Sequence, residues 1–274
     1  MSKPLSQTTI ALVTSAGISL KSDPPFDMER EKREPLWGDR SFRAIPRGTT
    51  EKDIDVNHLH INTTYIKQDI NVILPLTRMA ELEQEKIIGR LAPTAYSFYG
   101  FQWQNTDFLK EAIEPISKRM KLEGVAAVLL TPAWPFCCQS VGLAARVLEE
   151  SGFSTVVLTP TYEFHRAVGI PRSTAIEYPY GRPVGQVGDK DGQRRVLLSA
   201  LSILEKAKKP GEVLHLPFTW PEEPKKVDWQ PPEMSPLIKF YLEDIKKARK
   251  TQWIEELKRQ LRDFEIQSSE FTIA

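Results

Sequence analysis

The sequence predicts an α/β fold, in which an open parallel sheet is flanked by helices and divides into two similar halves, with a C-terminal helix added. The main observation is that apolar, β-type runs alternate with helical patterns from residue 125 to residue 208. This alternation is typical of a parallel sheet with crossover helices. A second observation is the apolar run Thr9–Thr14, which ends at Ser15-Ala16-Gly17 as a buried strand with a tight exit would.

Three parts are expected along the chain. An α/β catalytic-type domain covers residues 8–209 and divides into halves at 8–104 and 105–209. A proline-rich extended segment follows at 210–236. A charge-laced helix over 237–266 carries an apolar stripe, which suits docking on the domain or on a partner subunit.

The composition is that of an ordinary soluble globular protein. The chain has 274 residues, of which 41% are hydrophobic and 27% charged, and its net charge is +1. No general attraction to nucleic acid or to an anionic membrane is expected from such a balance. Two cysteines form no disulfide framework and fit the reducing cytoplasm. The polar start of the chain predicts no signal peptide, and no apolar run approaches the roughly 18 to 20 residues that span a bilayer.

The first half is expected to contain one long ordered excursion between strands. Residues 21–50 are charged and interrupted by prolines, yet they carry aromatic side chains that need burial, which is typical of a lid or binding loop. Alternation over 53–62 predicts a strand with His58 and His60 on one face. Helical spacing over 76–88 predicts a helix with Gly89 as its C-cap.

The second half reads as strands and helices in turn. A helix is expected from Asn105 or Thr106 to Leu122, with a break or kink at Pro115. The later elements are strands at 125–130, 154–159 and 173–178 and helices at 139–150, 162–169 and 191–208.

Both cysteines lie side by side in the turn that joins the strand at 125–130 to the helix after it. In an α/β fold ligands bind where strands end, and a helix N-terminus favours a thiolate. Cys137 is therefore a candidate nucleophile or redox group, and the alternative is a small buried hydrophobic side chain. Cys138 would form a strained vicinal disulfide with Cys137 or lie buried under the helix.

Other side chains are candidates for binding and proton transfer. His60 is expected to act as a general acid or as a donor to a substrate carboxylate. With His58 it would supply two metal ligands, but no third ligand is evident, so no metal is expected. Arg43 beside Ser41 suits a carboxylate clamp, with an ion pair to Asp39 as the alternative.

Further candidates follow the predicted strands. Glu163 and His165 come after the strand at 154–159 and would face the same crevice as Cys137. Pocket-lining roles are also expected for three residues: Ser15, Tyr99 and Trp134. An aromatic cluster around Tyr99 is equally typical of a core.

Several stretches, in this order, carry a resemblance to a known family. They are Ile10–Gly17, Ser41–Pro46, His58–Asn62, Asp69–Pro75, Glu81–Gly89, Tyr96–Gly100, and Val128–Leu130 through Pro135–Cys137 to Arg146. Together the chain resembles, over about residues 8–205, the selenoprotein B family of the glycine, sarcosine, betaine and D-proline reductases. The similarity is nearest to the D-proline reductase branch.

The resemblance implies reductive cleavage of a carbon–nitrogen bond. In that family a selenolate or thiolate attacks the α-carbon of an amino acid or amine, which is held on a pyruvoyl group of a partner protein. The family motif looks like Sec-x-x-Cys or Cys-x-x-Cys, and Trp134 and Cys137 occupy its two positions here. Because tryptophan is no nucleophile, the selenium-dependent step does not carry over.

The expected function is thus X–H/Y–H-type reduction of a small amino-acid-like or amine substrate through a thiol/disulfide couple at Cys137. No bound cofactor is expected. We expect an external dithiol or thioredoxin-like reductant, a pyruvoyl-type or redox partner protein, and a homo-oligomer. Two alternatives stay open. One is a diverged, non-redox binding or partner subunit, which Trp134 favours. The other is a non-redox thiol enzyme, a lyase or transferase, with His60 or His165 as the base.

Overall fold

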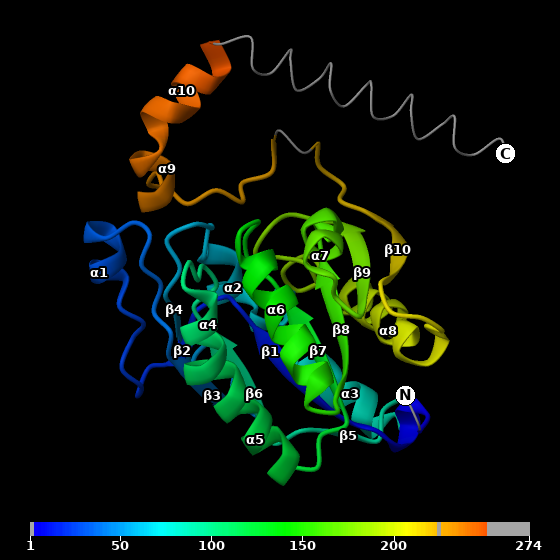
Figure 1. Cartoon of the computed structure of the whole chain (residues 1–274). Coiled ribbons are helices and arrows are strands. Elements are labelled where there is room, and N and C mark those ends of the chain that lie inside the picture. The colour runs from blue at the N-terminus through cyan, green and yellow to red at the C-terminus, as the bar shows by residue number, and fades with distance from the viewer. Residues whose placement is uncertain (1–2, 224–225, 251–274) are drawn as a thin grey trace, which may run out of the picture. The chain divides into compact units, whose positions relative to one another are not determined.

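The computed structural model describes residues 3–223 and 226–250. The chain divides into two compact units, residues 1–233 and 234–274, and each is described by itself. The first unit contains the α/β fold (Figure 1).

A mixed, mostly parallel sheet of eight strands forms the centre of the first unit. Its strands are β1 Thr9–Thr14, β3 Phe42–Pro46, β5 Arg90–Leu91, β6 Thr94–Phe98, β7 Ala127–Thr131, β8 Ser154–Thr159, β9 Arg172–Glu177 and β10 Glu212–Thr219. They are ordered β10-β9-β8-β7-β1-β6-β3, and β5 also pairs with β1. Only β3 runs antiparallel to its neighbour β6. The structure thus confirms the predicted α/β class.

Helices cover this sheet. Those of the first unit are α1 Met28–Arg33, α2 Thr64–Gln68, α3 Leu76–Gln84, α4 Asn105–Phe108, α5 Glu114–Leu122, α6 Cys137–Glu150, α7 Tyr162–Val168 and α8 Lys190–Lys206. Figure 1 shows α6 in front of β7 in this view. Short 3-10 turns lie at Leu5–Gln7 and Ile70–Val72.

The central strand β1 is buried on both faces. Ala11 and Val13 pack in one cluster with apolar residues of α5 and α6, such as Ile116 and Val141. Ile10 and Leu12, which alternate with them, are buried as well. Continuous apolar runs are what a parallel sheet covered on both faces requires, which explains why these strands were readable from the sequence.

The strand predicted over 53–62 is shorter than expected. β4 covers only Ile54–Val56 and pairs with β2, Ile18–Leu20, in a separate two-stranded antiparallel sheet. Beyond it, the backbone and side-chain N–H groups of Asn57 both donate to Gly17 O, at 2.8 and 3.3 Å, and Gly17 leaves the extended conformation with a φ of 63°. The segment that carries the two histidines therefore leaves the sheet.

Two predicted helices also differ from expectation. α3 ends at Gln84, since Lys86 takes a φ of 61°. Gly89 is not its C-cap: the Gly89 N–H instead donates to the carbonyls of Leu5 and Thr8 at the start of β5. The helix expected over 105–122 is helical throughout, but a π-helical turn at Leu109–Ile113 interrupts its α-helical hydrogen bonding just before Pro115, where a break or kink was expected.

The proline-rich segment contains a strand that the sequence did not predict. β10 adds to the sheet edge in parallel with β9, with a register irregularity between His215 and Thr219. Pro217 lies at that irregularity, and an edge strand tolerates a proline because one side of its backbone needs no partner.

The second unit is described over 234–250. It contains α9 Pro236–Phe240 and α10 Leu242–Lys250, with Tyr241 between them. Ser235 caps α9, because its hydroxyl accepts the Ile238 N–H at 3.4 Å. The single helix predicted over 237–266 is therefore two helices in this part, and residues 251–266 lie outside the described residues.

Candidate active site

The site lies where the order of the sheet reverses. β1 is flanked by β6 on one side and by β7 on the other, and all three run parallel. The strand order reverses at β1, and α/β proteins bind ligands beyond the carboxyl ends of the strands at such a switch point. The loops after β1, β6 and β7 touch there: the Ala133 N–H donates to Ser15 Oγ at 3.0 Å, and Ala16 forms a β-bridge with Tyr99.

Cys137 is the first residue of α6 and lies inside this junction. Its side chain has 0% of its surface exposed, and its Sγ is 3.5 Å from His58 Nε2. Gly100 makes the room for the sulfur, because a Cβ at that position would lie 2.3 Å from Cys137 Sγ. The predicted address of the thiol, at a strand-to-helix junction, is the observed one.

Hydrogen bonding fixes the proton on His58. The His60 backbone N–H donates to His58 Nδ1 at 3.2 Å, so Nδ1 is an acceptor. Burial, and then the charge of neighbouring His60, hold the pKa of His58 well below its usual value, so the ring is neutral. Its single proton must therefore sit on Nε2, which faces Cys137 Sγ. His58 is a hydrogen-bond donor to the sulfur and not its base.

Burial decides the ionisation of the thiol. It raises the pKa of Cys137 well above the usual value, and the neighbouring Cys138 adds to this, while the Ser15 hydroxyl and the Trp134 backbone oppose it. Burial thus opposes the thiolate that a helix N-terminus would favour, because a buried charge is costly. Cys137 is a protonated thiol here.

Glu31, His60 and Tyr99 form a buried hydrogen-bonded triad. Glu31 of α1 has 0% exposure, and its Oε1 lies 2.5 Å from His60 Nε2. Its Oε2 accepts the Tyr99 hydroxyl, and burial followed by this carboxylate raises the pKa of Tyr99 well above its usual value. His60 Nδ1 is buried and has no hydrogen-bond partner among the residues that the structure describes. With Nε2 directed at Glu31, Nδ1 is the free position for proton transfer.

Glu31 is the functional candidate that sequence reasoning missed, and His58 was considered only with His60, as an acid/base pair or as two metal ligands. Glu31 sits among charged residues of the 21–50 excursion, and nothing in that local pattern separates it from exposed Glu29. His58 was placed beside His60, but the contact with Cys137 belongs to His58. The signal available was the pair itself: two histidines two residues apart reach the same buried cluster, with ring centroids 5.5 Å apart.

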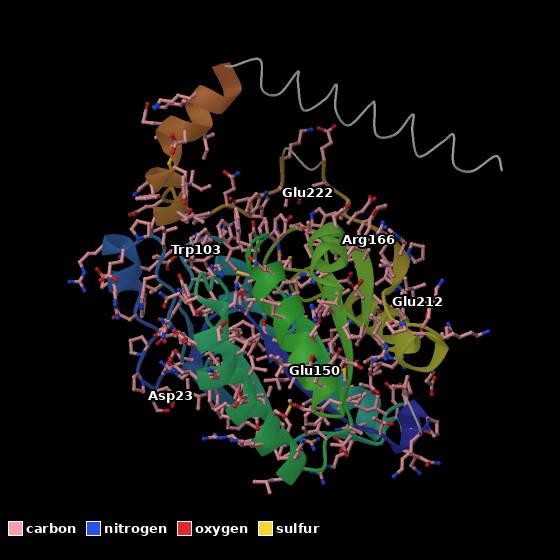
Figure 2. The ribbon with its side chains drawn as sticks, viewed as in Figure 1. Asp23, Trp103, Glu150, Arg166, Glu212 and Glu222 are labelled. Atoms are coloured by element: carbon pink, nitrogen blue, oxygen red, sulfur yellow. The ribbon has the colours of Figure 1, made fainter. Side chains whose placement is uncertain are left out.

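Trp134 closes the cluster from the side of the cysteine turn. Its indole stacks on the His60 ring with centroids 4.1 Å apart and is only 4% exposed. Phe136 packs on it at 4.8 Å and is partly exposed. Trp103, labelled in Figure 2, is 61% exposed and does not belong to this buried cluster. Trp134 thus covers His60.

Cys138 faces different surroundings. Its Sγ lies 3.6 Å from both Thr159 Oγ1 and Trp134 O, and burial raises its pKa to about 12. Neither cysteine is in a disulfide. The sequence left a choice between a vicinal disulfide and burial under the helix, and the structure shows burial.

Glu163 and His165 follow β8, as predicted, but are not joined to the Cys137 cluster by any hydrogen bond among the described residues. Glu163 is exposed, and its charge acts on Cys138. His165 is fully buried, both of its ring nitrogens lack partners in the described part of the chain, and burial lowers its pKa to about 4. His60 and His165, the two predicted bases, therefore make no hydrogen bond to Cys137 within the described chain.

Arg43 and Ser41 hold a loop. Arg43 Nε donates to Pro24 O at 2.9 Å, and Nη1 donates to Ser41 Oγ at 2.9 Å. The Ser41 hydroxyl donates to Asp39 Oδ1 at 2.5 Å, so it stands between Arg43 and Asp39. The guanidinium also lies over Phe26, 4.2 Å from the ring centroid. These contacts occupy the donors that a carboxylate clamp would need.

The described residues contain neither a metal-binding cluster nor a membrane-spanning helix. Within 3–223 and 226–250, no group of three or more His, Cys, Asp or Glu side chains is placed to hold a metal ion. No helix in the same ranges combines the length and apolar character needed to cross a membrane.

Comparison with known proteins identifies the family. Residues 2–133 match the model of the glycine/sarcosine/betaine reductase selenoprotein B family. The D-proline reductase subunit gamma of Acetoanaerobium sticklandii is 32% identical over 220 residues, which cover 80% of this chain and 88% of that protein. No solved structure matches the chain.

More distant relatives are longer. The glycine reductase complex component B subunit gamma of Carboxydothermus hydrogenoformans is 28% identical over 199 residues, covering 72% of this chain and 45% of that protein. The sarcosine reductase complex component B subunit beta of Peptoclostridium acidaminophilum is 26% identical over 207 residues, covering 74% and 47%. The chain spans less than half of either of these relatives, but most of the D-proline reductase subunit. It belongs to the selenoprotein B family of the glycine, sarcosine, betaine and D-proline reductases.

Proposed function

We propose that this chain is a subunit of a reductase complex that cleaves a carbon–nitrogen bond of a small amino acid or amine, with Cys137 as the reacting thiol. The observation that carries the proposal is the contact of Cys137 Sγ with His58 Nε2, 3.5 Å long, at the switch point of the sheet. The family membership supports the reaction class, and the relatives named above are subunits of reductases.

The reaction balances with one protein thiol and one external dithiol. Cys137 sulfur attacks the α-carbon, so a C–S bond forms, the C–N bond breaks, and the leaving amine takes the thiol proton. One thiol of the dithiol then attacks Cys137 sulfur; an S–S bond forms, the C–S bond breaks, and the carbon takes that thiol's proton. The second thiol releases Cys137 and closes the disulfide. The substrate gains two electrons and the dithiol loses them.

The neighbouring side chains have separate roles in this scheme. His58 Nε2–H donates to the sulfur and stabilises the thiolate once the proton has left. Glu31 holds His60 through Nε2, so that His60 Nδ1 accepts or returns a proton at the reacting centre. Because Cys137 is fully buried, surrounding side chains must move to admit substrate. The reductant is a dithiol or thioredoxin-like protein, no cofactor is bound, and a pyruvoyl-type partner presents the substrate.

Turnover in cysteine variants tests this proposal. Cys137→Ser and the matched control Cys138→Ser would be assayed for dithiothreitol-dependent release of ammonia or amine from glycine, sarcosine and betaine, and for ring opening of D-proline to a chain with a primary amine. The protein would be used both alone and with the subunits that copurify with it. Cys137→Ser should lose activity, and Cys138→Ser should keep it. Equal turnover in both variants, or none in the wild type, refutes the thiol mechanism.

A second candidate function is a non-redox partner subunit, which the position of Trp134 and the burial of Cys137 favour. Trp134 replaces the leading nucleophile and stacks on His60, and burial keeps Cys137 protonated. Alkylation by iodoacetamide as a function of pH separates the two functions. Reaction of Cys137 only above about pH 8.5, with substrate present and no turnover, supports the partner subunit.

A further inference from the structure

The loop around α1 reaches the site through one buried side chain. This α1 loop, residues 27–37, comprises α1 and the turn after it, and within it only Glu31 is buried. Its other side chains are exposed or half-buried, and Figure 1 shows α1 at the edge of the first unit in this view. A segment with so little buried apolar surface has a low free energy of local opening.

The α1 loop is held together by its own contacts. Arg30 Nε lies 3.1 Å from Glu34 Oε2, and the Arg30 guanidinium lies over Trp37, 4.5 Å from the ring centroid. The two ends of the loop meet, because the Asp27 N–H donates to Asp39 Oδ2 at 2.9 Å. Compact surface loops whose ends are close and whose side chains pack on one another are frequently functional. Such a loop is suited to move as one body.

The chain on either side of the α1 loop is fixed by hydrogen bonds. Before the loop, Arg43 Nε and Nη2 donate to the carbonyls of Pro24 and Pro25 at 2.9 and 3.3 Å. After the loop, Gln102 Nε2 donates to Asp39 O at 2.6 Å. These bonds place the hinges at the two ends of the loop, and they give Arg43 a structural role there.

Glu31 joins the α1 loop to the site. Its Oε1 lies 2.5 Å from His60 Nε2, and its Oε2 accepts the Tyr99 hydroxyl. The pKa of Cys137 is raised first by burial, then by Cys138, and also by the charge of Glu31, so the carboxylate lies near the thiol. Breaking such bonds inside a closed, buried site is costly, because it leaves the charge without a partner and without water.

The strand ends around Cys137 are less free to open. The Ala133 N–H donates to Ser15 Oγ, and Ala16 is bridged to Tyr99, so the loops after β1, β6 and β7 are joined to one another. Those strands belong to the buried core, and separating their ends would expose it. Because Cys137 is 0% exposed, a molecule that reaches its sulfur needs a path, and the α1 loop provides the path of least cost.

We propose that the α1 loop is a lid over the site and that Glu31 is the latch that holds it closed. When the lid opens, the Glu31 carboxylate passes into water, where it needs no protein partner, and the thiol becomes accessible. When the lid closes, Glu31 again holds His60 through Nε2. Substrate entry and orientation of His60 therefore belong to two different states. The inference rests on the proposed function for the chemistry and adds how access to that site is regulated.

Alkylation of Cys137 by iodoacetamide at a fixed pH measures lid opening without turnover. All proteins would carry Cys138→Ser, so that Cys137 is the one cysteine. We expect Glu31→Gln to react roughly tenfold or more faster than this parent, because the latch loses its charge, and exposed Glu29→Gln to react at the parent's rate. Tyr99→Phe keeps the ring but removes one bond to the latch, and it should react about fivefold faster.

Hydrogen exchange followed by mass spectrometry separates lid opening from a change in the acidity of the thiol. In the parent, the amides of residues 27–37 should exchange before those of β1, and in Glu31→Gln they should exchange roughly tenfold faster again. Leu201→Ala truncates a buried side chain of α8 and so lowers the stability of the whole unit. It should leave the exchange of residues 27–37 at the parent's rate, because local opening does not depend on that core contact.

The competing point of entry is Phe136, which is 43% exposed beside Trp134. The lid is refuted if Phe136→Ala speeds alkylation and Glu31→Gln does not. It is also refuted if Glu31→Gln and Glu29→Gln exchange alike over the α1 loop, or if Leu201→Ala speeds that exchange as much as Glu31→Gln does.

These outcomes are separate from those of the turnover assay. The expected lid behaviour, together with equal turnover in Cys137→Ser and wild type, would keep the lid and remove the thiol mechanism. Loss of turnover in Cys137→Ser, with no effect of Glu31→Gln on exchange or alkylation, would keep the mechanism and overturn the lid.

Discussion

Replacement of Gly100 by alanine should disturb the site through one methyl group. The added Cβ would lie 2.3 Å from Cys137 Sγ, 2.9 Å from Cys137 Cβ and 2.8 Å from Ser15 O, whereas ordinary contacts begin near 3.4 Å. The sulfur would have to move by more than an ångström. The Ser15 carbonyl has little freedom to yield, because Ser15 N–H and Oγ both take part in hydrogen bonds to the β7 side. Overpacking of this kind costs about 2 to 3 kcal/mol.

Urea denaturation followed by circular dichroism measures that loss in free energy of unfolding. Gly48→Ala is the matched control, since nothing lies within 4 Å of its Cβ, and it should leave stability within about 0.5 kcal/mol of wild type. Alkylation of Cys137 should also become faster in Gly100→Ala, because the sulfur is displaced from its enclosure. A Gly100→Ala protein as stable as Gly48→Ala, with unchanged alkylation, would refute the packing described for Cys137.

Three further perturbations test the surroundings of the site. Glu31→Gln should lower the free energy of unfolding by about 3 kcal/mol, since it uncouples a fully buried pair, whereas exposed Glu29→Gln should have little effect in the same urea titration. Burial lowers the pKa of His165 from its ordinary value of 6.5 to about 4. At a pH between these two values the unfolded chain binds a proton that the folded chain does not, so the free energy of unfolding falls as the pH is lowered. His165→Leu should remove about 2 kcal/mol of the loss measured between about pH 7.5 and 5, and an unchanged slope would contradict its burial as a neutral ring. Burial would raise the pKa of Asp69, but hydrogen bonds from Gly188, Gln193 and Asn71 outweigh it and lower the pKa below 3.8. The stability that Asp69 adds is therefore present above about pH 4 and lost as pH falls through the folded-state pKa, and Asp69→Asn should flatten this acid limb of the unfolding curve; a limb as steep as that of wild type would argue against these bonds.

The parts of the fold that the sequence predicted are those set by local pattern. β8 has the predicted bounds, because Ser154–Thr159 is a single apolar run in a buried parallel strand. The start of α6 at the cysteine turn was also predicted, since its apolar face repeats with helical period. β10 was not, because Pro217 and mixed polarity are permitted only by its place at the sheet edge, and that place depends on β9.

The site itself was only partly predictable, for a related reason. The position of Cys137 between a strand and a helix follows from the local sequence pattern. Its ionisation depends on burial by residues that are distant in the sequence. Glu31 and His60 are 29 residues apart, and Glu31 and Tyr99 are farther apart still. Such pairs are brought together by the tertiary fold alone, so no periodicity or spacing in the sequence distinguishes Glu31 from exposed charges.

The claim that Cys137 is the reacting thiol is tested most directly by mass spectrometry of the protein quenched during incubation with D-proline and no reductant. The scheme above predicts a substrate-derived thioether on Cys137, in the wild type and in Cys138→Ser, that disappears when a dithiol is added. Cys137→Ser should carry none. An adduct located on Cys138, or an unmodified Cys137 under conditions in which D-proline is consumed, would contradict the account.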